Sequence, residues 1–125
     1  MIAGVGADLC QVSRIAKALE NERFLNRLYT AAERARLENL GPERRAERAA
    51  GMFAAKEAVA KALGTGFNGF GFDDIEILAD NLGKPVVRLS NGAQSRASGG
   101  YVHISISHDG GYALAFAVLE REDRP

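Results

Sequence analysis

The sequence predicts a mixed fold, with helices in the first half of the chain and strands in most of the second. Residues 43–63 form a long alanine-rich segment with helical spacing, whereas residues 101–107 and 112–119 alternate as strands do. A glycine-rich loop, residues 64–71, separates the two halves.

The first expected element is a short apolar strand over residues 2–9. Alternation places Gly4, Gly6 and Asp8 on one of its faces. We expect a buried strand that delivers Asp8 at its C-terminal end, beside glycines that leave room for a ligand.

Two helical stretches should follow this strand. Ser13 is the expected N-cap of a helix over residues 14–21. A second stretch begins near Thr30, where Glu33 has the spacing of a capping box.

The long central helix is expected to cover residues 43–63. Pro42 suits its first turn, and Gly64 should end it. At 100° per residue one stripe should face the core. The residues of this stripe are Met52, Ala55, Val59, Ala62 and Leu63.

The second half of the chain contains the remaining strands. Residues 74–79 and 85–89 are predicted strands joined by a turn-rich tetrad, residues 80–83. Residues 91–98 are a short expected helix, and the last two strands flank a hairpin turn at residues 109–111.

Composition limits the class of protein. The 125 residues suit one domain, and 46% apolar residues suffice for an ordinary core. Sixteen basic and sixteen acidic residues balance, so total charge does not steer the chain to nucleic acid. Cys10 is the only cysteine, which fits a reducing compartment. With no signal peptide and no spanning segment, we expect a cytoplasmic protein with no membrane partner.

Two carboxylates from distant parts of the chain are candidate metal ligands. Glu57 lies one helical turn before Lys61, and a solvent-facing ion pair is the alternative explanation. The surrounding alanines favour burial or a ligand wall, where charges need partners. Asp8, taken alone, could be an ordinary strand-end aspartate. Together the two carboxylates indicate a hard cation such as Mg²⁺, and therefore a substrate that carries phosphate.

The strand-like stretch HISISHD, residues 103–109, ends near His108. A polar strand cap is the alternative explanation for this histidine. Ser107, His108 and Asp109 do not predict a catalytic triad, because adjacent side chains of an extended chain point in different directions. The Walker-A and dinucleotide fingerprints are absent from the sequence.

Three stretches of the chain carry a resemblance to a known family. They are GVGADLCQVSRI at residues 4–15, FAAKEAVAKALGTG at 53–66 and HISISHD at 103–109, with a weaker match of GKP at 83–85. In this order and spacing they resemble the acyl-carrier-protein synthases of the 4′-phosphopantetheinyl transferase family. The similarity extends over nearly the whole chain.

The resemblance implies a magnesium-dependent transfer of 4′-phosphopantetheine from coenzyme A to a serine of apo-acyl carrier protein, which supports fatty acid biosynthesis. The by-product is adenosine 3′,5′-bisphosphate. The resemblance further implies an α+β fold in one transferase domain, residues 1–125, in which a small antiparallel sheet packs with the long central helix. Homotrimers with coenzyme A sites between neighbouring subunits are typical of the family.

The resemblance also implies roles for individual residues. Asp8 and Glu57 match the magnesium ligands, and Lys61 matches a lysine near the pyrophosphate. Glu57, a metal-bound water and Lys61 remain alternatives for accepting the serine proton. The positions matched to the coenzyme A site, besides Lys61, are Arg44, Arg45, Gly64, Thr65, Gly66, Lys84, Pro85 and His108.

Arg14 matches the basic residue that meets the carrier protein. Because carrier proteins are acidic, Lys17 and Arg23 are further expected contacts. A solvated amphipathic face is the alternative for these two residues. Ile15 and Phe24 could add an apolar anchor.

The chain departs from the family pattern at Met52, where arginine is common. If that arginine contacts a coenzyme A phosphate in relatives, this chain needs another cation, for which Arg48 is the candidate. Cys10 and Gln11 also replace the usual aliphatic and acidic residues.

Three rival functions remain open. They are a non-enzymatic coenzyme A or nucleotide binder, an arginine-rich nucleic-acid binder built on residues 13–48, and a transferase that acts on polyketide or peptide-synthetase carriers. The presence of Asp8, Glu57 and Lys61 together disfavours the non-enzymatic binder. Interleaved glutamates disfavour the second.

Overall fold

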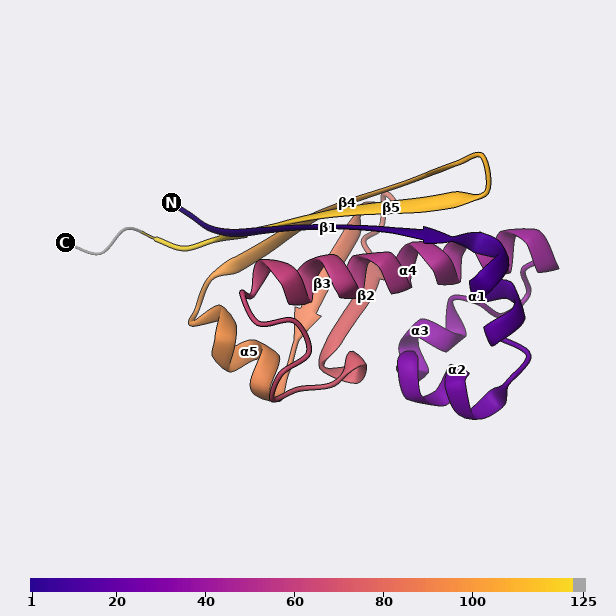
Figure 1. Ribbon diagram of the computed structural model, residues 1–125, viewed down its shortest axis with the longest axis horizontal. Helices are drawn as coiled ribbons and strands as arrows, with labels where there is room; N and C mark the ends of the chain where they lie inside the picture. Colours follow the sequence, from indigo (N-terminus) through magenta and orange to yellow (C-terminus); the bar gives the residue numbers. More distant parts are fainter. Residues whose placement is uncertain (123–125) are drawn as a thin grey trace.

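The computed structural model describes residues 1–122, which form two antiparallel sheets and several helices (Figure 1). The larger sheet has the order β1 (Ile2–Gln11), β5 (Tyr112–Glu120), β4 (Tyr101–Asp109). The smaller sheet pairs β2 (Ile75–Ala79) with β3 (Pro85–Leu89). The predicted α+β class is confirmed, with two sheets in place of one.

The helices occupy the segments between these strands. Their bounds are α1 (Val12–Ala18), α2 (Glu22–Leu28), α3 (Ala31–Ala35), α4 (Pro42–Ala62) and α5 (Asn91–Ala97), with a 3-10 turn, η1, at Phe72–Asp74. The prediction for α4 is confirmed to within one residue at each end. Gly64 follows it with a φ of 91°, as a helix-ending glycine does.

Helix α4 lies along the larger sheet and forms the centre of the molecule (Figure 1). Twelve of its 21 residues are buried, on several faces, because β1, β5, β2 and α1 all pack against it. The expectation of a single core-facing stripe was therefore too narrow. A helix that is apolar nearly all round is a buried helix.

Strand β1 packs its glycine face on α4. A Cβ atom on Gly6 would lie 2.0 Å from the carbonyl oxygen of Ala58, and one on Gly4 would lie 2.0 Å from that of Ala62. The expectation that these glycines leave room for a ligand is therefore wrong, since the backbone of α4 fills the space. The opposite face of β1 is exposed, so the expectation of a buried strand is wrong for that face.

The N-terminal helices differ from the prediction at their boundaries. Ser13 is not an N-cap, because α1 begins at Val12, whose N–H donates to the carbonyl of Gly111. Most of α1, residues 14–18, lies in the predicted range of residues 14–21, but the helix ends three residues early. Asn21, expected to end a helix, instead caps α2, which the prediction missed. The predicted capping box of Thr30 and Glu33 is confirmed.

A buried ion pair ties α4 to α3. Lys56 Nζ lies 2.8 Å from Glu33 Oε1, and both side chains are fully buried. The ammonium also donates to the carbonyls of Phe72 and Ile75, each at 2.7 Å. Within residues 1–122, no helix has both the length and the apolarity to span a bilayer.

Candidate active site

Asp8 and Lys61 meet where β1 crosses the C-terminal half of α4. Lys61 Nζ donates to the carbonyl oxygen of Ala7 at 2.8 Å and lies 3.4 Å from Asp8 Oδ1. The lysine side chain is 52% exposed, so this ion pair contributes little to stability. Its ammonium remains accessible to an anion from solvent.

Glu57 lies one turn before Lys61 and shares a cavity of about 370 Å³ with Asp8. Burial and then the negative charge of Asp8 raise the pKa of the Glu57 carboxyl, while Lys61 opposes this shift. The two carboxylates therefore repel each other, and a cation between them would relieve that repulsion. Within the described chain no group of three or more acidic, histidine or cysteine side chains gathers as a metal site. Magnesium needs only one or two carboxylates, so the pair fits this ion.

The same cavity reaches toward the basic N-terminal helices. Arg14 of α1 lines it, together with Phe24 and Phe53. These two phenylalanines also line an adjoining groove of about 890 Å³ between α2 and η1, to which Arg23 contributes. Lys17 is exposed in the last turn of α1.

A second, basic cavity of about 330 Å³ lies near the N-terminal half of α4. Three of the residues matched to the coenzyme A site line it, namely Arg44, Pro85 and His108. Arg36, Arg48 and Met52 also line it. The sequence analysis did not single out Arg36, because it treated the charge of residues 13–48 as a whole.

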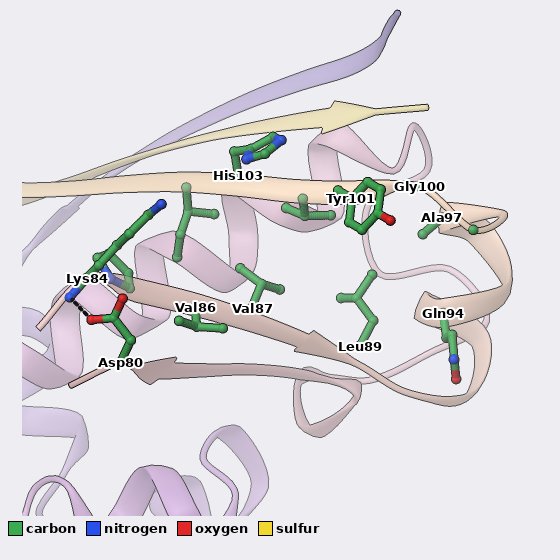
Figure 2. Close-up of a pocket in the computed structure, with 14 residues that line it drawn as sticks. Asp80, Lys84, Val86, Val87, Leu89, Gln94, Ala97, Gly100, Tyr101 and His103 are labelled. Atoms are coloured by element: carbon green, nitrogen blue, oxygen red, sulfur yellow. Dashed lines mark hydrogen bonds between the residues drawn. The ribbon is translucent and has the colours of Figure 1, made fainter. Parts of the chain in front are cut away.

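The other residues matched to coenzyme A lie outside this cavity. Lys84 lines a groove between β3 and β4, and Figure 2 shows it beside Asp80, at the opposite end of the groove from Gln94. The Lys84 backbone N–H donates to Asp80 Oδ1 at 2.9 Å. Arg45 is half-buried on α4.

Residues 64–66 follow the C-terminal end of α4, near Lys61. Gly64 and Gly66 both have positive φ, which suits a tight turn. At a rise of 1.5 Å per residue, Lys61 lies about 25 Å along α4 from Arg44. One chain therefore presents the residues matched to coenzyme A as two separate groups, at the two ends of one helix.

Comparison with known proteins agrees with this geometry. Residues 4–117 match the model of the 4′-phosphopantetheinyl transferase superfamily. A holo-[acyl-carrier-protein] synthase of Clostridium novyi is 50% identical over 124 residues, covering 96% of this chain and 88% of that protein. The crystal structure of the Bacillus anthracis synthase in complex with CoA (3′,5′-ADP) matches with a TM-score of 0.84 at 41% identity, covering 98% of this chain and 99% of that one. The Helicobacter pylori synthase in complex with coenzyme A matches with a TM-score of 0.82 at 30% identity, over 93% and 99%. The chain therefore belongs to the 4′-phosphopantetheinyl transferase superfamily.

Proposed function

We propose that this chain is a holo-acyl-carrier-protein synthase of a single domain. It transfers the 4′-phosphopantetheine arm of coenzyme A to a serine hydroxyl of apo-acyl carrier protein. The observation that carries the proposal is the convergence of Asp8, Glu57 and Lys61 beside one cavity. The chain is also 50% identical to a protein named for this activity.

The proposed reaction forms a bond between the serine oxygen and the phosphorus that bears pantetheine. It breaks the bond from that phosphorus to the bridging pyrophosphate oxygen and releases adenosine 3′,5′-bisphosphate. Asp8 and Glu57 would hold Mg²⁺, which supplies neutralisation of the pyrophosphate charge. Lys61 adds a second positive charge for the leaving phosphate, because the Ala7 carbonyl and Asp8 leave part of its ammonium free. Glu57 can accept the serine proton directly, whereas Lys61 could accept it only as the neutral amine, in which form it would not supply the positive charge.

The carrier protein is proposed to dock on α1 and α2. Arg14 lines the cavity that contains Glu57, so an acidic partner bound there brings its serine to the reacting phosphate. Arg23 and Phe24 extend this surface along the adjoining groove. Lys17 and Ile15 remain predicted contacts, although Ile15 is buried and contributes as part of the cavity wall.

We further propose a homotrimer whose sites lie between neighbouring subunits. The outer face of the larger sheet exposes large apolar side chains, among them Val5, Leu9 and Phe116, each more than 50% exposed. An apolar face of this kind marks a contact with another protein surface. The arrangement also explains why residues matched to one coenzyme A molecule lie at opposite ends of α4. Each site would combine the residues at one end of α4 in one subunit with those at the other end of α4 in its neighbour.

The decisive test is an intact-mass assay of apo-acyl carrier protein incubated with this protein, coenzyme A and Mg²⁺. We expect a gain of one phosphopantetheine arm that is lost with EDTA. Glu57→Ala and Asp8→Ala should lower the rate about 10²–10³-fold, the usual effect of removing one preorganised electrostatic contact. Glu38→Ala, an exposed glutamate outside the cavities described above, is the matched control.

Failure to modify any carrier, with coenzyme A still bound, would instead favour the non-enzymatic binding module. A panel of fatty-acid, polyketide and peptide-synthetase carriers would identify the acceptor. A cytoplasmic location and a role in fatty acid biosynthesis remain predictions, the former resting on the single cysteine.

A further inference from the structure

The basic cavity near the N-terminal half of α4 brings several arginine side chains together. Three arginines line it: Arg36, Arg44 and Arg48. Within residues 1–122, none of them forms an ion pair with a carboxylate. The carboxylate that does line the cavity, Glu47, faces His108 Nδ1 at 3.5 Å.

Two of these arginines are held close together by backbone contacts. Arg36 Nη1 donates to the carbonyl of Ile77 at 3.1 Å, and Arg48 Nη1 donates to the carbonyl of Arg36 at 3.0 Å. A guanidinium has five N–H donors, so each keeps most of them for a ligand. Burial and then the charge of Arg48 lower the pKa of Arg36, and the negative charge of Glu33 partly opposes this shift. The fold therefore brings like charges together, and a bound anion would offset that repulsion.

Position 52 contributes no charge to this cavity. Met52 is 2% exposed and lines the wall beside the arginines. Arg36 reaches the same cavity from a different element, at the C-terminal cap of α3. Arg36, at the end of α3, therefore supplies a positive charge to the cavity, whereas Met52 of α4 supplies only an uncharged side chain.

We infer that Arg36, acting with Arg48, binds the 3′-phosphate of coenzyme A and makes the enzyme selective for coenzyme A over 3′-dephospho-coenzyme A. The inference rests on the proposed function. Coenzyme A carries a pyrophosphate and a separate 3′-phosphate, and the pyrophosphate is assigned to Asp8, Glu57 and Lys61. The remaining group is a phosphate monoester, whose charge of nearly −2 and three oxygens suit paired guanidinium groups.

The test compares the two donors in the transfer assay. In Arg36→Met we expect kcat/KM for coenzyme A to fall about 10–100-fold, the loss typical of one charge-assisted hydrogen-bonding group. The value for 3′-dephospho-coenzyme A should stay the same, because that donor lacks the phosphate that Arg36 contacts. Arg36→Lys should retain part of the preference, since it keeps the charge. Arg88→Met, an arginine on β3 that is 74% exposed and outside the cavity, should leave the donor ratio unchanged.

The kcat/KM values for the two donors are measured on one preparation of each variant. A misfolded fraction therefore lowers both values by the same factor and does not change their ratio. An equal fall in kcat/KM for both donors in Arg36→Met would overturn the inference and give Arg36 a purely structural role. Wild-type kcat/KM values for both donors would overturn it as well. If the wild-type protein transferred from neither donor, the proposed function itself would fail.

Discussion

At the scale of single residues, the buried pair of Lys56 and Glu33 is an important contribution to the fold. The ammonium has three partners: the Glu33 carboxylate and the carbonyls of Phe72 and Ile75. Glu33 in turn accepts from the N–H of Ile77 at 2.7 Å. Burial lowers the pKa of Lys56, and the charge of Glu33 opposes that shift.

Removing only one member of this pair should therefore be costly. We expect Lys56→Met to lower the free energy of unfolding by about 3–5 kcal/mol, because a buried carboxylate loses its counter-charge. The double variant Lys56→Met with Glu33→Gln should recover part of this loss. Urea denaturation measures four proteins: the wild type, Lys56→Met, Glu33→Gln and the double variant. A double variant with the sum of the two single losses would show that the charges do not interact.

At the scale of elements, the contact between β1 and α4 positions Asp8 relative to Glu57. A side chain on Gly6 would collide with the backbone of Ala58, which cannot move aside as a flexible side chain can. Gly6→Ala should therefore displace β1 and cost about 1–3 kcal/mol of stability, as overpacking does. Because Asp8 lies two residues on, the rate of transfer should fall as well.

Thermal unfolding and the mass assay, run on the same samples, check this prediction. Gly41→Ala is the matched control, since nothing lies within 4 Å of a Cβ atom at Gly41. A full rate in Gly6→Ala would show that the position of Asp8 does not depend on this contact.

A second prediction concerns helix α1. Arg14 belongs to the proposed docking surface for the carrier protein and also lines the cavity that contains Glu57. Arg14→Glu should raise the KM for the carrier protein at least about 10-fold, since close charge pairs across interfaces contribute more than 1.4 kcal/mol. The KM for coenzyme A should change little. Arg88→Glu on β3 is the control, because it makes the same charge reversal outside the proposed docking surface. Steady-state kinetics, with each substrate varied in turn, measure both KM values. An unchanged KM for the carrier protein would contradict the proposed docking surface.

At the scale of the whole molecule, the two groups of residues at the ends of α4 predict complementation between inactive subunits. Glu57→Ala lacks one group, and the double variant Arg44→Ala with His108→Ala lacks part of the other. In randomly mixed trimers of the proposed kind about one site in four combines two intact halves, so about a quarter of wild-type activity should return. The measurement is the mass assay after the two variants are unfolded and refolded together. No recovery would place the complete site within one chain.

Sequence reasoning succeeded where local signals determine structure. Pro42 and Gly64 mark the ends of α4, and Thr30 with Glu33 marks the start of α3, because caps depend on neighbouring residues alone. Tertiary contacts explain the errors. Ser13 is not a cap because Val12 bonds to a turn that lies about 100 residues later in the chain.

The site shows the same division between local and tertiary information. Glu57 and Lys61 face the same side because they are one turn apart, and this could be predicted from their spacing alone. The presence of Arg36 beside Arg48 could not, since it depends on how α3 packs on α4. The close approach of β1 to α4 could not be predicted either. A glycine in a strand indicates that something comes close to the backbone, but it does not show whether this is a ligand or another segment of the chain.

The pairing of β1 with β5 has a consequence for how the chain is made. The two strands lie side by side, with Ile2 opposite Glu120 and Gln11 opposite Tyr112, so the start of β1 and the end of β5 lie at the same end of the sheet (Figure 1). A ribosome that adds roughly 5–20 residues per second needs about 5–20 s to pass from one strand to the other. Throughout that interval the nascent β1 has no partner strand. Asp8 is therefore among the first residues of the site to be synthesised and among the last to be held in place.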